Sequence, residues 1–123
     1  MHLSVFRWSV VSVNAEENLA ARFLRLAGYQ VLSRNDRRFF AEIDLLVRSP
    51  DSAELFIVEV KRRRHDQADF PLISDMQRQR LTAAAGALMQ EASGYMHVRM
   101  LLLVVDATRQ SAEIIGDITL GDR

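Results

Sequence analysis

The chain has 123 residues, of which 49% are hydrophobic and 26% charged, a composition typical of one globular domain with a single core. It contains no cysteine, which excludes disulfides, thiolate metal sites and cysteine nucleophiles and is compatible with a reducing, cytoplasmic location. Sixteen basic residues balance sixteen acidic ones, so general coating of a polyanion is not expected. The opening apolar stretch is interrupted by Arg7 and is too short to span a bilayer, so no membrane association is expected.

The first predicted element is a helix. We expect one domain over residues 1–123, with a core from about residue 14 to 120 and an N-terminal extension at 1–13. Apolar residues recur at helical spacing from Ala15 to Ala27, with Asn14 as a suitable N-cap and Gly28 as a C-terminal stop. Residues 29–33 then alternate between apolar and polar, as a short strand does.

The middle of the chain predicts a hairpin and a second helix. Strands are expected at 40–48 and 55–61, joined by the turn sequence Ser-Pro-Asp-Ser at 49–52. Residues 64–73 form a polar loop, and Ser74 or Asp75 then begins a helix that runs to about Glu91 and closes at Ser93-Gly94. The methionines at 76, 89, 96 and 100 are expected to fill the core.

The last elements determine the predicted topology. The unbroken apolar run at 98–105 fits a strand buried on both faces, and residues 112–118 fit an edge strand. A long helix between the third strand and this apolar strand indicates a crossover, and hence some parallel pairing. The chain is therefore predicted to be an α/β sandwich, with a mixed central sheet of four to five strands flanked by helices.

Strand alternation brings three ionisable residues together. Residues two apart on a strand share a face, so Glu59 and Lys61 lie side by side, and the hairpin can bring Asp44 next to Glu59. Carboxylates flanked by apolar neighbours are costly to desolvate unless they are paired or bind a cation. Two converging carboxylates suit a hard divalent cation such as Mg²⁺. Lys61 could then orient an attacking water or stabilise a transition-state phosphate.

The simplest alternative is an ordinary Glu–Lys salt bridge at the end of a strand. One feature of the sequence favours a catalytic role. The chain has fifteen arginines and a single lysine, which is Lys61. On a solvated surface either residue serves, whereas lysine and arginine are not interchangeable at a catalytic point-charge site.

Four ordered segments resemble a known family, the YraN-like proteins. They are Glu17-x-x-Ala20 with Phe23-Leu24, Arg34-Asn35-x-Arg37, Glu42-Ile43-Asp44-Leu45, and Phe56-Ile-Val-Glu-Val-Lys61-Arg62. The YraN-like proteins are an uncharacterised group of small bacterial proteins similar to Holliday-junction resolvases. They are placed in the PD-(D/E)XK nuclease superfamily, which has the restriction-endonuclease-like fold. The resemblance runs from about residue 14 to 106.

The resemblance implies a metal-dependent endonuclease that hydrolyses phosphodiester bonds in DNA, including branched or structured DNA. Asp44 and Glu59 would bind Mg²⁺ or Mn²⁺, Lys61 would be catalytic, and Glu17 would reach the metal from the first helix. A carboxylate that merely interacts with the helix dipole is the alternative for Glu17. Glu42 is expected to be a supporting or surface residue.

Basic residues flank these segments and are candidates for contacts with DNA phosphates. Solvated strand ends and loops are the alternative for them. They are Arg34, Arg37, Arg38, Arg62, Arg63, Arg64 and Arg78.

The chain also departs from the family pattern. Ala41 stands where the family usually has Gly, Pro71 where it often has Gly, and Gln77 near a position where it usually has Lys. The competing functions are a non-catalytic nucleic-acid-binding module and a structural protein whose three residues form a buried ion network. There is no Gly-rich phosphate loop, so no nucleotide cofactor is expected. The oligomeric state stays open, with a homodimer among the alternatives.

Overall fold

The computed structural model describes residues 15–37, 41–51, 54–63, 73–91 and 97–118. Several sequence predictions lie outside these residues: the N-terminal extension, the Asn14 cap, Arg38, Arg64, most of the 64–73 loop, Pro71 and the Ser93-Gly94 stop. The described elements are α2 (Ala15–Leu26), β1 (Gln30–Asp36), β2 (Ile43–Arg48), β3 (Glu54–Arg62), α3 (Asp75–Glu91), β4 (His97–Asp106) and β5 (Ser111–Asp117).

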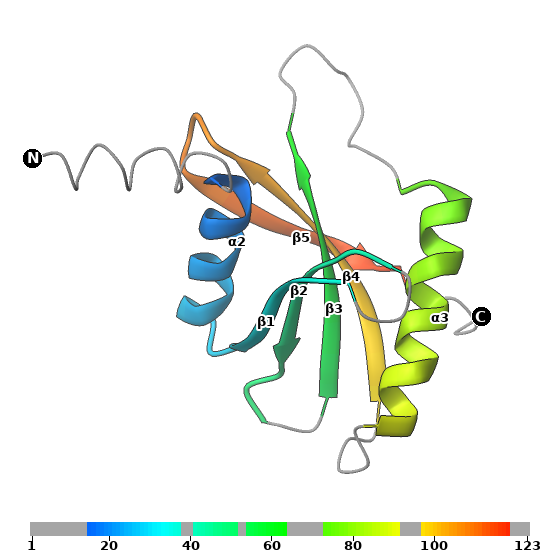
Figure 1. Ribbon diagram of the computed structural model, residues 1–123. Coiled ribbons are helices and arrows are strands. Elements are labelled where there is room, and N and C mark those ends of the chain that lie inside the picture. Colours follow the sequence, from blue (N-terminus) through cyan, green and yellow to red (C-terminus); the bar gives the residue numbers. More distant parts are fainter. Residues whose placement is uncertain (1–14, 38–40, 52–53, 64–72, 92–96, 119–123) are drawn as a thin grey trace, which may run out of the picture.

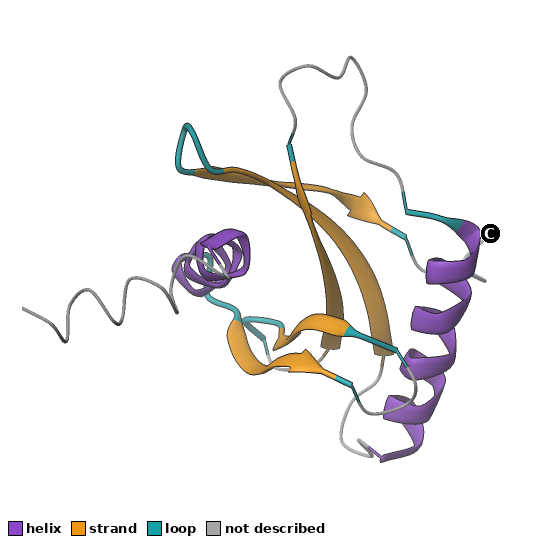
Figure 2. Ribbon diagram, turned by 45° about the horizontal axis from the view of Figure 1, so that its top comes forward, coloured by secondary structure: helices purple, strands orange, loops and turns teal. Residues whose placement is uncertain are grey.

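The five strands form one mixed sheet in the order β1-β2-β3-β4-β5. Every neighbouring pair is antiparallel except β3 and β4, which are parallel and joined through α3. Helices α2 and α3 lie on opposite faces of the sheet (Figure 1; Figure 2). The predicted α/β sandwich, the hairpin and the parallel crossover are confirmed.

Each face of the sheet has its own apolar core. On one face, α2 packs Leu19 and Leu24 against Val58 of β3, among other residues. On the other face, α3 packs Leu81 and Leu88 against Ile57 of β3. The central strands are buried on both faces, which is why the 98–105 segment is apolar at almost every position.

Local signals fix the helix ends. The Ser74 Oγ accepts the Gln77 backbone N–H at 3.1 Å, so Ser74 is the N-cap of α3, one of the two residues predicted for it. Gly28 has φ of 96°, and the Tyr29 N–H donates to the Leu24 carbonyl at 2.9 Å, which ends α2. No helix among the described residues is long and apolar enough to cross a membrane.

The prediction that all four methionines fill the core is wrong for two of them, and strand alternation fails at one position of β2. Met76 and Met89 are exposed, at 62% and 50%, because they lie on the outer surface of α3, whereas Met100 on β4 is fully buried. Ile43 packs in the α3-side core with Leu46, although strict alternation would place it with Leu45 and Val47. Ile43 lies before Leu45, the first residue of β2 in the paired register with β3. At Ile43 the register therefore pairs β2 with β1 but not with β3.

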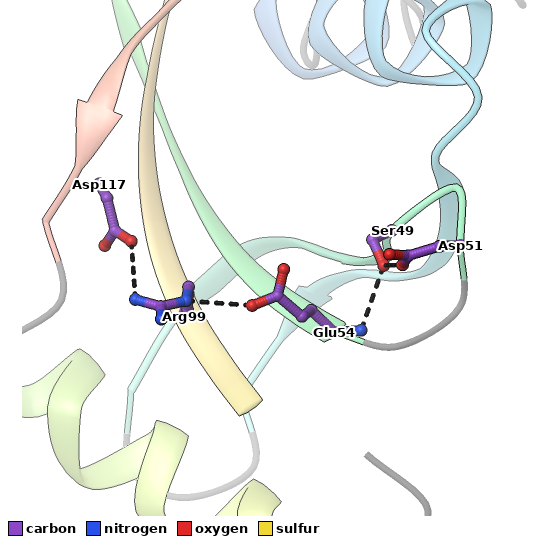
Figure 3. A network of polar contacts seen from close by, with 5 residues as sticks. All are labelled: Ser49, Asp51, Glu54, Arg99 and Asp117. Carbon is purple, nitrogen blue, oxygen red and sulfur yellow. Dashed lines mark hydrogen bonds and ion pairs between the residues drawn. The ribbon is translucent and has the colours of Figure 1, made fainter. Parts of the chain in front are cut away.

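A polar network holds the end of the sheet farthest from the C-terminal end of β3 (Figure 3). Arg99 on β4 pairs with Glu54 on β3 at 3.1 Å and with Asp117 on β5 at 3.3 Å. Ser49 accepts the Glu54 backbone N–H at 3.1 Å and so closes the turn between β2 and β3. These contacts tie together three adjacent strands and fix the register on which the opposite end depends.

Candidate active site

Asp44 and Glu59 meet where the hairpin of β2 and β3 ends. The register pairs Leu45 with Val58, and one further step places Asp44 opposite Glu59. The two side chains are within hydrogen-bonding distance of each other. The Asp44 Oδ2 also accepts the Val60 backbone N–H at 2.9 Å. The side chain of Asp44 thus takes the place of a backbone acceptor at the end of the ladder.

The environment of this carboxylate pair is apolar. Glu59 is 5% exposed, and the parallel register with β4 sets it beside Leu102. Burial, and then the charge of Glu59, raise the pKa of Asp44 to about 7, although the Val60 N–H opposes the shift. A buried carboxyl beside a second carboxylate is typical of sites that take up a cation.

Lys61 and Gln77 complete the cluster around Glu59. The Lys61 Nζ lies 3.3 Å from the Glu59 Oε2. Gln77, in the first turn of α3, donates its amide N–H to the same oxygen at 2.5 Å and accepts from Lys61 at 3.4 Å. Gln77, on α3, therefore contacts both Glu59 and Lys61, which lie on β3.

Glu17 approaches the pair from α2. Burial, and then the charge of Asp44, raise the pKa of Glu17. Asn35, whose φ of 51° is in the left-handed region, hydrogen-bonds the Glu17 side chain. The Glu17 Oε1 is buried and has no hydrogen-bond partner among the described residues.

The donor set fits a divalent cation of the Mg²⁺ type. Within the described ranges, no three acidic or histidine side chains are arranged as a ready metal-binding group. Mg²⁺ is usually held by only one or two carboxylates, with waters and substrate phosphates as its other ligands. Asp44 and Glu59 supply two carboxylates, and Glu17, on which the charge of Asp44 acts, has one buried oxygen without a partner among the described residues.

The predicted basic residues do not form one group. Arg62 lies 3.7 Å from Glu16, and Arg63 lies 3.3 Å from Glu113, so both are engaged within the domain. Arg37 is exposed at the end of β1. Arg34 turns toward α2 and donates to the Asn18 Oδ1 at 2.6 Å. The Nε of Arg78 on α3 is buried and lacks a partner among the described residues.

A cavity of about 320 Å³ opens beside the cluster, between α3 and the start of β2. Gln77 lines it together with Met76, Arg80 and the exposed Glu42. Gln77 is thus shared between this cavity and the cluster around Glu59.

Sequence reasoning treated Gln77 only as a departure from the family pattern. The contact of Gln77 with Glu59 depends on where α3 lies relative to β3. The crossover between the two elements sets that distance, and the sequence does not give it. The available signal was its position three residues after Ser74, which puts it in the first turn of a capped helix.

These features define a small α/β domain with a buried carboxylate pair and a lysine at the end of a central strand. A family model described as "Uncharacterised protein family UPF0102" matches residues 16–107, so the chain belongs to that family. UPF0102 is the YraN family, which confirms the resemblance found in the sequence.

Similar curated proteins carry only the family name. A UPF0102 protein of Desulfosudis oleivorans is 33% identical over 102 residues, covering 80% of this chain and 81% of that protein. One of Mesorhizobium japonicum is 37% identical over 84 residues, covering 68% and 66%. One of Syntrophus aciditrophicus is 41% identical over 58 residues, covering 47% of this chain and 44% of that protein.

Proposed function

We propose that this chain is a metal-dependent nuclease that hydrolyses phosphodiester bonds in DNA. The observation that carries the proposal is the contact of two carboxylates, Asp44 and buried Glu59, with the only lysine of the chain 3.3 Å from one of them. A scaffold gains little from such a cluster, because adjacent buried carboxylates destabilise the fold unless a cation or proton offsets them. The likeness of the YraN family to PD-(D/E)XK nucleases supports the same reaction.

In this proposal each residue has a defined task. Asp44 and Glu59 would hold the cation, and Glu17 would contribute an acceptor from α2. When bound, Mg²⁺ or Mn²⁺ supplies charge neutralisation at the phosphate and a more acidic water. Lys61 orients the attacking water or meets the charge that develops on the phosphate. The apolar neighbours of Glu59 strengthen these interactions by lowering the local dielectric constant.

A cleavage assay on a panel of DNAs tests the proposal. Linear, nicked, branched and single-stranded DNA should each be incubated with the protein in Mg²⁺, in Mn²⁺ and in EDTA. We expect cleavage of at least one substrate with metal, none in EDTA and none with Asp44→Asn. Intact DNA in every metal condition would contradict the nuclease. Tight binding without cleavage would instead support the non-catalytic nucleic-acid-binding module.

Gln77 provides a second test, because it acts on the site only through Glu59 and Lys61. Removing its amide in Gln77→Ala frees the Glu59 Oε2 and loosens Lys61, so we expect the cleavage rate at saturating DNA to fall about tenfold, with KM little changed. Gln79→Ala, at an exposed position two residues further along α3, is the matched control. Equal rates for the two variants would remove Gln77 from the positioning of Lys61.

A further inference from the structure

A second cavity, of about 620 Å³, lies along α2. It is formed by α2, by β1 and by the turn between β4 and β5, which lies next to the start of α2 (Figure 1). Three arginines line it: Arg22 and Arg25 from α2, and Arg34 from β1. Asn18 and Gln110 are among its other lining residues.

Two of the three guanidinium groups donate hydrogen bonds to neutral amides. Arg34 donates to the Asn18 Oδ1 at 2.6 Å, and Arg22 donates to the Gln110 Oε1 at 3.5 Å. Other arginines of the described segments form ion pairs with carboxylates, including Arg62, Arg63, Arg99 and Arg109. None of the three cavity arginines has such a pair within the same segments, so no carboxylate of the described residues lies at ion-pair distance from their guanidinium groups.

Two residues that line the cavity are next in sequence to residues of the candidate active site. Asn18 follows Glu17 on α2, and Arg34 precedes Asn35, which hydrogen-bonds Glu17. The charge of Arg34 also acts on Glu17 and opposes the rise in its pKa. A DNA strand whose reacting phosphate lies at Asp44 and Glu59 would therefore reach this cavity where the DNA runs alongside α2.

We infer that the Arg22, Arg25 and Arg34 cavity binds a phosphate group of the DNA strand, away from the bond that is cut. The inference rests on the proposed function, because it takes the strand bound at the carboxylate pair as the occupant. Arginine suits this task because its planar fork donates to two phosphate oxygens at once. The amides of Asn18 and Gln110 hold two of these forks in place.

A binding titration in EDTA tests the inference without requiring cleavage. The probe is a fluorescent DNA duplex, measured by anisotropy over a range of salt concentrations. We expect Arg25→Gln and Arg34→Gln each to weaken binding and to lower the slope of log Kd against log salt by about one. Arg25 is exposed on the helix surface, so its replacement leaves the core untouched. Arg48→Gln, at the far end of β2 beside Gln30, is the control and should bind like the wild type.

The outcomes separate this inference from the nuclease proposal. Wild-type affinity and slope in both cavity variants would overturn the inference and leave the cleavage result unaffected. Cavity-dependent binding without metal-dependent cleavage would support the cavity and contradict the nuclease. If inorganic phosphate raised the Tm of the wild type but not of Arg25→Gln, while DNA affinity stayed equal, the cavity would take a free phosphoanion, and the DNA assignment would be overturned.

Discussion

Lys61→Arg is expected to lower DNA cleavage by about a hundredfold or more, the range for losing one preorganised electrostatic group. The substitution keeps the positive charge and a similar length. However, the planar guanidinium is bulkier and cannot occupy the point that the Nζ holds, 3.3 Å from Glu59 and 3.4 Å from the Gln77 Oε1. DNA binding should persist, and the free energy of unfolding should change by under about 1 kcal/mol. Cleavage rates at saturating DNA measure the first effect, and anisotropy and thermal melts measure the others.

Arg62, the next residue on β3, offers a matched control in which arginine is replaced by lysine. Arg62 is exposed, and its guanidinium lies 3.7 Å from Glu16 rather than in the Glu59 cluster. Arg62→Lys exchanges the same two residue types one position along β3, and it should cut at the wild-type rate. A Lys61→Arg protein that also cuts at the wild-type rate would remove the lysine from the mechanism and return the Glu59–Lys61 pair to an ordinary salt bridge.

Without metal, the wild type is expected to lose stability as the pH rises from about 5.5 to 8, and Asp44→Asn is expected to lose less. The pKa of Asp44 is about 7 in the folded protein against 3.8 for an ordinary aspartate, so folding favours its protonated form. That stabilising contribution is complete below pH 3.8 and is lost as the pH rises through 7. The difference between the two proteins should change by an amount on the order of 2 kcal/mol over this range. Denaturant titrations in EDTA measure it.

A divalent cation should reverse this loss at pH 8. Mg²⁺ or Mn²⁺ that binds only the folded state raises the Tm of the wild type with its concentration, whereas Asp44→Asn should show no comparable rise. Asparagine keeps an oxygen for the Val60 N–H, so the variant removes the charge and preserves the contact. Glu42→Gln removes an exposed carboxylate whose charge is the smallest of the causes that raise the pKa of Asp44, so it should weaken the pH dependence only slightly and keep the metal response. Parallel pH curves for wild type and Asp44→Asn would show that Asp44 is already ionised at low pH.

The sequence predicted best what depends on neighbours along the chain or across one hairpin. Alternation along β3 placed Glu59 and Lys61 on one face, and the turn at 49–52 fixed the register that brings Asp44 to Glu59. The contact of Gln77 with Glu59 depends on how the crossover sets α3 over the sheet, and no local pattern encodes that distance.

The basic residues show the same limit. Arg34 begins one family motif and Arg62 ends another, and both were candidates for contacts with DNA phosphates. In the fold, Arg62 meets Glu16 at the start of α2, whereas Arg34 joins Arg22 and Arg25 in a cavity built from three separate elements. The packing of α2 on the sheet decides which arginines form an ion pair with a carboxylate. Charge clusters in the sequence could not identify those arginines.

The hydrogen bond from the Val60 N–H to Asp44 gives position 44 a second duty, independent of any chemistry. An apolar residue there would leave a backbone donor without its acceptor at the end of the ladder, at a cost of about 1–3 kcal/mol. A descendant of this protein without the proposed activity would therefore still favour Asp or Asn at this position. Lys61 lies beside Glu59 and Gln77, and among the described residues its Nζ contacts their side chains rather than a backbone group. Under relaxed selection we therefore expect the lysine to be substituted before the aspartate.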